Sequence, residues 1–142
     1  MLGEIILSRE SKGANVRVID SITSKREVSI KATGKLKNNV DVDIIVTYWN
    51  NRISDDMLYG EGQSVIIAIN DDNNDNNNET VAFKEYGIGK IVENNKISWR
   101  GSIIFQTSSN GKLSFLNNTI GLFETEEDNT TGIVIEKVWE WR

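Results

Sequence analysis

The chain has 142 residues, contains no Pro, Cys or His, and carries 21 acidic against 16 basic side chains, which gives a net charge of −5. This length fits one domain. The absence of Cys and His excludes Ser-His-Asp triads, cysteine nucleophiles, disulfides and Cys/His zinc sites, so any catalysis must use carboxylates, Lys, Tyr or Arg. We expect no cofactor and no bound metal.

The distribution of charge argues against nucleic-acid binding. Residues 1–69 hold nine bases and nine acids, so the negative excess lies in residues 70–142, and no clustered basic surface is visible for phosphate contacts. The first residues lack the basic start and long apolar run of a signal peptide, and no run approaches the roughly 20 apolar residues of a membrane span. We therefore expect a cytoplasmic protein that binds neither nucleic acid nor membranes.

Runs of β-branched and aromatic residues alternate along the chain with clusters of Asn, Asp, Gly and Ser, and apolar residues almost nowhere recur at helical spacing. The predicted strands span residues 3–10, 26–36, 40–50, 57–69, 79–92, 96–108, 112–126 and 133–141, with 14–22 as a candidate for a further short strand. No segment forms the helix that a parallel crossover needs, so the sheet should be antiparallel. Because long strands in one small domain favour closure, we predict an all-β fold, a single antiparallel up-and-down β-barrel of about eight strands over residues 1–142.

The Asn-rich tract of residues 70–79 matches a calcium-binding loop only in part. Asp71, Asn73 and Asp75 stand at alternate positions, but Asn76 occupies the place of the required Gly, and Ala82 that of the final Glu. A solvated hairpin loop is therefore favoured over a calcium site.

Two tight turns allow the later hairpins to be placed in register. Asn110-Gly111 is typical of a type I′ turn, and Asn94-Asn95 is a weaker signal of the same kind. We therefore expect Glu93 to oppose Lys96 and Ser109 to oppose Lys112, which sorts three strands into two faces. The rows of the first face are Phe83–Gln106–Phe115, Glu85–Ile104–Asn117, Gly87–Ser102–Thr119, Gly89–Arg100–Gly121 and Ile91–Ser98–Phe123.

The first face is bulky at both ends and small or polar in the middle, and two interpretations of it remain open. In one, the glycines and Ser102 leave a cavity inside the barrel that Arg100, Glu85 and Asn117 line. In the other, the glycines permit strand curvature, Arg100 lies across them on the outer surface, and the apolar second face fills the core. Both faces are more apolar than the solvated sheet of a monomer, which favours a homo-oligomer.

Seven short segments carry a further signal: Tyr59-Gly60-Glu61-Gly62-Gln63, Gly87-Ile88-Gly89-Lys90, Arg100-Gly101-Ser102, Thr107-Ser108-Ser109, Leu116-Asn117-Asn118, Gly121-Leu122-Phe123-Glu124 and Trp139-Glu140-Trp141. Together they resemble a family of small uncharacterised prokaryotic proteins, many from ammonia-oxidising archaea, over roughly residues 40–142. The resemblance implies a lipocalin-like barrel similar to the calycin and allene oxide cyclase type, with no established activity. The family has a small residue in place of Glu85. The site candidates that the resemblance favours instead are Glu61, Gln63, Arg100 and Asn117.

Three hypotheses about function follow. The first is a binding module, in which a small amphipathic or anionic ligand enters the barrel and its acidic group meets Arg100, whose planar guanidinium suits a carboxylate or phosphate. The second is an isomerase or cyclase similar to allene oxide cyclase, with Glu61 or Glu85 as acid and base. Asn117 or Ser102 would then donate a hydrogen bond. The third is a pocketless homo-oligomeric assembly module.

The binding module is favoured, because one carboxylate is little evidence for catalysis. The only partners we expect are a small-molecule ligand and further copies of the chain. The predicted ligand-binding residues are Arg100, Glu61, Gln63, Glu85, Ser102 and Asn117.

Overall fold

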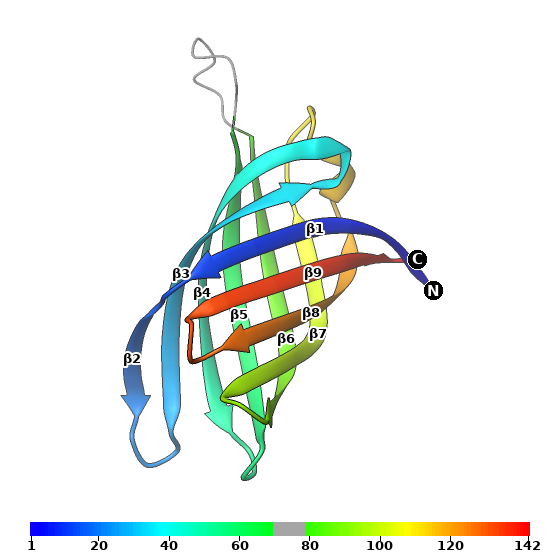
Figure 1. Cartoon of the computed structure of the whole chain (residues 1–142). Coiled ribbons are helices and arrows are strands. Elements are labelled where there is room, and N and C mark those ends of the chain that lie inside the picture. The colour runs from blue at the N-terminus through cyan, green and yellow to red at the C-terminus, as the bar shows by residue number, and fades with distance from the viewer. Residues whose placement is uncertain (70–78) are drawn as a thin grey trace.

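Antiparallel strands follow one another around a closed ring (Figure 1). The structure is a computed structural model that describes residues 1–69 and 79–142. Its strands are β1 (Leu2–Lys12), β2 (Asn15–Asp20), β3 (Lys25–Leu36), β4 (Val40–Arg52), β5 (Met57–Ala68), β6 (Thr80–Val92), β7 (Lys96–Gln106), β8 (Ile120–Asp128) and β9 (Ile133–Trp141). The sheet order is β1-β9-β8-β7-β6-β5-β4-β3-β2, and a further pairing of β1 with β3 closes eight strands into a barrel with β2 outside it. The predicted all-β, antiparallel, up-and-down barrel is confirmed, and the candidate segment 14–22 contains β2.

Two short 3₁₀ helices, η1 (Lys37–Asn39) and η2 (Ser114–Leu116), interrupt the strands. Within the two described ranges, neither these nor any other helix is long and apolar enough to cross a membrane. The solvated loop predicted over residues 70–79 lies, apart from Glu79, outside the described residues.

Closure of the barrel depends on β1, which pairs with β9 along one edge and with β3 along the other. Leu7 lies where they meet, directly opposite Val138 on β9 and Leu36 on β3, and all three side chains are buried. Register shifts on both sides of Ile5 accompany this double pairing, and such irregularities bend a strand. Closure removes the free sheet edges that β1 and β3 would otherwise present.

The interior of the barrel is filled with apolar side chains at one end and open at the other. Residues alternate between the inner and outer faces with the period of two expected for strands. Phe83 and Phe105 pack edge to face inside the filled half, with ring centroids 5.7 Å apart. The other large apolar residues buried there are Leu7, Leu36, Val42, Ile44, Ile66, Val81, Ile103 and Val138.

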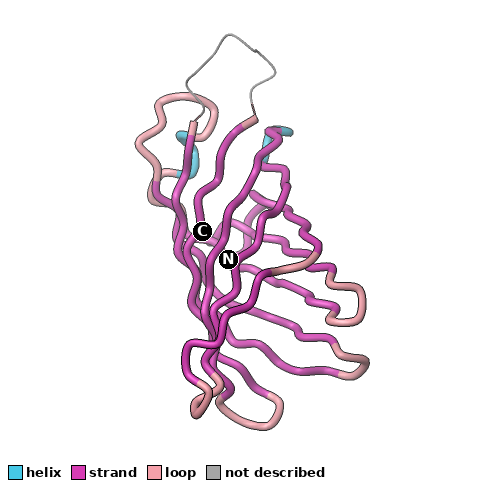
Figure 2. Tube along the Cα trace, turned by 90° about the vertical axis from the view of Figure 1, so that its left-hand side faces the viewer, coloured by secondary structure: helices cyan, strands magenta, loops and turns pink. Residues whose placement is uncertain are grey.

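The segment of residues 107–119, between β7 and β8, covers the filled end. Its Leu113 and Leu116 are fully buried. The Glu79 carboxylate holds the segment by accepting hydrogen bonds from the Ser109 hydroxyl and from the backbone N–H of Lys112. Figure 2 shows the two 3₁₀ helices near the same end of the barrel.

This segment corrects two predictions. The predicted strand over 112–126 begins only at Ile120, and Asn110-Gly111 is not the tip of a two-residue hairpin. The physical reason is the burial of Leu113 and Leu116. Their apolar side chains are removed from water inside the barrel end, so the chain crosses that end before β8 begins.

The hairpin between β6 and β7 turns through three residues, Glu93, Asn94 and Asn95, and not through two. Both asparagines adopt the left-handed conformation, with φ of 64° and 59°, which Asn tolerates better than most residues. Lys96 consequently pairs with Val92 and not with Glu93. The shift of one residue inverts β7, so each of its side chains lies on the face opposite to the predicted one.

The pairing of β7 with β8 differs from the prediction as well. Ile104 lies opposite Ile120, three positions beyond the expected Asn117. Because both shifts are odd, β8 keeps its predicted face relative to β6 while β7 between them is inverted. The alternation therefore directs Arg100 and Ser102 of β7 to the outer wall.

The buried segment that covers the filled end makes a stability prediction. Leu116→Ala removes a fully buried side chain and should lower the free energy of unfolding by about 2–5 kcal/mol, because the neighbouring side chains close the cavity only in part. Asn117→Ala is the matched control, since this neighbour is exposed, and it should change stability by less than about 0.5 kcal/mol. Urea denaturation measures both, and equal effects would contradict the packing described.

Candidate functional site

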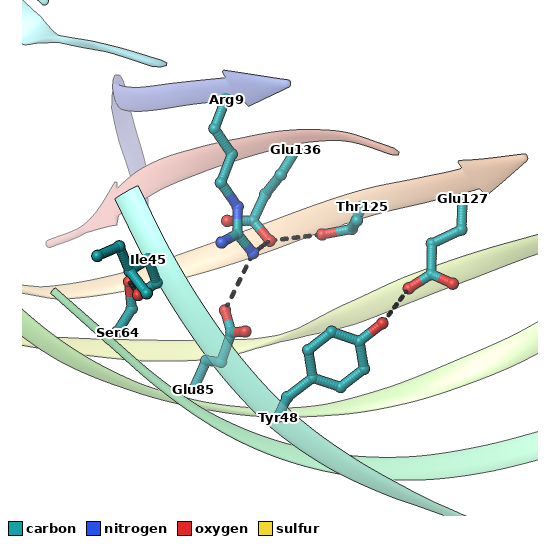
Figure 3. Close-up of polar contacts among 8 residues, drawn as sticks. All are labelled: Arg9, Ile45, Tyr48, Ser64, Glu85, Thr125, Glu127 and Glu136. Atoms are coloured by element: carbon teal, nitrogen blue, oxygen red, sulfur yellow. Dashed lines mark hydrogen bonds and ion pairs between the residues drawn. The ribbon is translucent and has the colours of Figure 1, made fainter. Parts of the chain in front are cut away.

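An arginine and two glutamates meet inside the barrel (Figure 3). Arg9 of β1 and Glu136 of β9 are direct partners in the register, and Arg9 Nη2 donates a hydrogen bond of 2.7 Å to Glu136 Oε2. Thr125 of β8, on the other side of Glu136, donates its hydroxyl to the same oxygen at 2.6 Å. Glu85 of β6 approaches from across the barrel, with Oε2 3.6 Å from Arg9 Nη2. We call these four residues the Arg9 cluster.

The Arg9 cluster is withdrawn from solvent, with the Arg9 side chain 9% exposed and that of Glu136 1%. Removing charges from water is unfavourable, and direct pairing with additional hydrogen bonds offsets that penalty. Burial lowers the pKa of Arg9, but the Glu136 and Glu85 carboxylates outweigh this effect and hold the pKa above its usual value. Arg9 therefore stays charged in the interior.

Glu85 is the least well compensated member of the cluster. Burial raises its pKa from 4.5 to about 7, while Arg9 acts in the opposite direction and the like charge of Glu136 raises it further. No described residue forms a hydrogen bond with its Oε2. Glu85 therefore exchanges its proton near neutral pH, a property that is frequent among carboxylates at functional sites.

A second polar pair crosses the barrel between strands that are not neighbours in the sheet. The Tyr48 hydroxyl of β4 donates a hydrogen bond of 3.0 Å to Glu127 Oε1 of β8. Burial raises the pKa of Tyr48 well above its usual value, and the negative charge of Glu127 adds to this effect. Burial also raises the pKa of Glu127, against the influence of Tyr48 and Trp99. Both groups are thus kept in an environment that disfavours their negative charge.

The Arg9 cluster and this second pair border an inner cavity of about 40 Å³, which has room for a few water molecules. A wider mouth of about 420 Å³ lies at the end of the barrel formed by the β6–β7 and β8–β9 turns. The residues that line both spaces are Ile30, Tyr48, Glu127 and Val134. The Arg9 cluster therefore lies at the bottom of a funnel, and the Tyr48–Glu127 pair lies at its neck.

Glycines in the wall bring large side chains close to the backbone. A Cβ at Gly89 would lie 2.8 Å from the Trp99 indole, and a Cβ at Gly62 would lie 2.9 Å from the Glu85 carboxylate. Only glycine permits such close approach on a strand. Gly89 thus accommodates the Trp99 indole and does not provide the open space that we expected from it, whereas Gly87 lines the inner cavity, as do Gly60 and Gly62.

Polar atoms without partners converge on the inner cavity. Native structures leave few buried polar atoms without a partner from the protein, a water or a ligand. Within residues 1–69 and 79–142, the cavity-lining atoms with no hydrogen-bond partner are Arg9 Nη1, Trp99 Nε1, Glu85 Oε2 and Glu136 Oε1. The cavity therefore offers both donors and acceptors to whatever occupies it.

Of the six predicted ligand-binding residues, Glu85 alone belongs to the Arg9 cluster. Arg100 lies on the outer wall, where its side chain is 77% exposed and its Nε lies 3.6 Å from Glu124. Ser102 lies on the same outer face of β7, and Gln63 is exposed on β5. The expectation that Arg100 lines the interior is wrong because β7 is inverted relative to the predicted register.

Glu61 and Asn117 also lie apart from the Arg9 cluster. Glu61 borders the inner cavity, but its carboxylate accepts a hydrogen bond of 2.7 Å from the Tyr59 hydroxyl, which raises the pKa of Tyr59. Asn117 is exposed at the end of η2, because its segment covers the barrel end and is not a strand. The expected grouping of Asn117 with Glu85 is therefore wrong.

The site residues that the sequence analysis missed are Arg9, Tyr48, Thr125, Glu127 and Glu136. One signal was present in the sequence. Glu136 stands between Val134 and Val138 in the alternating pattern of an inward face, where an isolated carboxylate indicates a buried partner.

The Arg9 cluster predicts a large difference between two arginines. Arg9→Met leaves two buried carboxylates without their cation and should lower the free energy of unfolding by about 3–5 kcal/mol. Arg100→Met, the matched control on the outer wall, should change it by less than about 0.5 kcal/mol. Thermal or urea denaturation distinguishes the two, and a larger loss in the Arg100 variant would contradict the observed register.

The raised pKa of Glu85 predicts a pH-dependent stability. The folded protein holds this proton more tightly than the unfolded chain, so stability is fully present below about pH 4.5 and is lost as the pH rises through about 7. Glu85→Gln carries no such proton, so it should gain stability relative to wild type over that range. Urea denaturation across pH 4.5–8 measures the difference, with Glu124→Gln on the outer wall as the control for removing one carboxylate. A difference that does not vary with pH would contradict the assignment.

No family model and no curated protein matches the chain. A crystal structure of a protein with unknown function from Clostridium acetobutylicum ATCC 824 is similar, with a TM-score of 0.70, 13% sequence identity and coverage of 98% of both chains. Similarity at this level of identity shows the fold alone. The resemblance to an archaeal family and to calycin barrels stays a prediction, and the chain is a small β-barrel protein that shares its fold with this clostridial protein.

Proposed function

We propose that the barrel binds a small amphipathic ligand, which enters through the open mouth and directs its polar end to the inner cavity. The observation that carries this proposal is the convergence of unpartnered, buried donors and acceptors on one cavity. A filled core would have satisfied or excluded such atoms. Their position at the bottom of a funnel favours a ligand that arrives from outside.

The dimensions of the mouth suit the apolar body of such a ligand. Its volume of about 420 Å³ falls within the range of roughly 300–1,000 Å³ that is common for small-molecule pockets. An eight-stranded barrel is wide enough to hold one small ligand. The apolar residues that line the mouth are Val16, Val28, Ile30, Leu58, Ile91, Ile97 and Val134.

The acidic end group that we expected at Arg100 has no support from the geometry. Arg100 lies on the outer wall, and the buried Arg9 is already held by Glu136. The inner cavity instead presents two donors and two acceptors, so the polar end of a ligand can form hydrogen bonds with its lining.

Acid and base catalysis on the bound molecule is a second candidate function, favoured by one observation. Glu85 lines the cavity and has a pKa of about 7, the range in which a carboxyl group both gives and accepts protons at neutral pH. Ser102 and Asn117 lie away from the cavity, so Arg9 Nη1 and Trp99 Nε1 are the donors available to an isomerase or cyclase. Glu85→Gln would then abolish turnover.

A pocketless assembly module is the least favoured hypothesis, because the described residues line a cavity. Large apolar side chains are nevertheless exposed on the outer wall, and they include Ile45, Val65, Ile104 and Ile120. Assembly into a homo-oligomer therefore stays a prediction, which light scattering of the purified protein checks.

Filling the mouth tests the binding proposal. Val134 of β9 lines both the mouth and the inner cavity, whereas its neighbour Ile135 is exposed on the outer wall. We expect the native protein to bind N-phenyl-1-naphthylamine, an uncharged fluorescent probe, with an increase in probe fluorescence. Val134→Trp should weaken this binding about tenfold or more, because the indole occupies the space that the probe needs.

Ile135→Trp is the matched control, since it places the same side chain one residue away on the other face, and it should bind the probe as wild type does. Circular dichroism verifies that both variants are folded. Probe binding that survives Val134→Trp, or that is lost only in Ile135→Trp, would place the probe on the outer wall and contradict the proposal.

A further inference from the structure

The inner cavity carries more acid than base. Four glutamates line it, Glu61, Glu85, Glu127 and Glu136, whereas Arg9 is the single basic side chain among its described lining residues. Arg9 forms its 2.7 Å hydrogen bond with Glu136. Glu85 pairs with the same guanidinium at the longer distance of 3.6 Å, and Glu127 accepts a hydrogen bond from the uncharged Tyr48 hydroxyl. One guanidinium group therefore faces several carboxylates, which leaves the cavity with an excess of negative charge.

Aromatic rings line the same cavity. Tyr48 and Trp99 pack edge to face, with ring centroids 6.4 Å apart and an interplanar angle of 69°, and Phe123 borders the cavity from β8. The faces of such rings attract cations, most strongly for Trp. The buried Oε2 of Glu85, which has no hydrogen-bond partner among the described residues, lines the same space. Aromatic rings of this kind are typical of sites for ammonium groups, and the carboxylates add negative charge to the same space.

We propose that the polar end of the ligand is a small organic cation, an ammonium group held by Glu85 and Glu127 beside the rings of Tyr48 and Trp99. The inference rests on the proposed function, because it assigns the class of ligand to the same cavity. The inner volume of about 40 Å³ limits this end to a small group such as a primary or methylated ammonium. The apolar body of the amine lies in the wider mouth.

The charge of the cavity favours a cationic end of the ligand over an anionic or an uncharged one. An anionic end adds a further negative charge to a cavity that four glutamates and a single arginine line, and like charges in such a site repel strongly. When the end of the ligand is uncharged, Glu85 is neutralised only by taking up a proton, as its pKa of about 7 indicates. An ammonium group takes the place of that proton and pairs with the ionised carboxylate.

The ionisable groups around Glu85 are compatible with the replacement of its proton by an ammonium group. Arg9 faces it from β1 and Glu136 from β9, and these two already form a pair. Tyr48 faces it from β4 and is hydrogen-bonded to Glu127 of β8. Binding of an amine should therefore strengthen as the pH rises from about 6 to about 8, because Glu85 loses its proton over that range.

Three compounds with the same apolar body and different ends test the inference. Isothermal titration calorimetry of the full chain at pH 7.5 compares octylamine, 1-octanol and octanoate. Octylamine should bind about tenfold or more tightly than either of the others, because its end forms charge-assisted hydrogen bonds. In Glu85→Gln the affinity for octylamine should fall to that for octanol, while octanol binding is unchanged. Glu124→Gln, on the outer wall, is the matched control and should bind all three compounds as wild type does.

If Glu85→Gln fails to fold, Glu127→Gln serves as the second variant, with the same expected loss of preference for the amine. Equal affinities for the three compounds, or tightest binding of octanoate, would overturn the cationic assignment and leave the ligand-binding barrel in place. An unchanged preference for octylamine in both glutamine variants would also overturn it. Absence of binding for all three compounds would contradict the proposed function itself.

Discussion

The hydrogen bond of 2.7 Å between Arg9 and Glu136 lies on the seam where β1 meets β9, the first and last strands of the barrel. A charged pair in this position needs good geometry, because the surrounding apolar side chains provide no solvation. Thr125 on the adjoining strand donates a second hydrogen bond to the same oxygen of Glu136. The seam and the neighbouring cavity therefore share one guanidinium group, which also opposes the burial that raises the pKa of Glu85.

The architecture of the barrel was predictable because it depends on local sequence. Alternation of apolar and polar residues, interrupted by Asn and Gly clusters, indicated the strands, including the short β2. The pairing of those strands was less predictable, since it depends on the exact length of each turn. Asn94 and Asn95 form a turn with Glu93, and this one additional residue inverts β7. The Asn110-Gly111 signal was overridden by Leu113 and Leu116, whose burial at the barrel end is a tertiary effect.

The candidate site was less predictable than the fold, because it is assembled from residues that are remote in sequence. Glu85 was identified from the sequence, but the arginine assigned to it was Arg100, which the inverted strand places outside. Arg9 appears in the sequence as one of several charged residues in an amphipathic strand. Its inward direction becomes evident only when Leu7, two residues earlier, is seen to meet both β9 and β3. The charge balance of the cavity follows from this meeting of distant strands and not from any local motif.

Arg9 and Glu136 are separated by 127 positions in the sequence. This separation affects the order in which the parts of the barrel fold. Hairpins between consecutive strands form from nearby residues, whereas the seam joins opposite ends of the chain, and contacts of such long range make folding slow. An intermediate with an open sheet would have most of its hairpins but no enclosed cavity. The enclosed cavity should consequently be the last feature to form during renaturation, after most of the backbone hydrogen bonds are already protected from exchange.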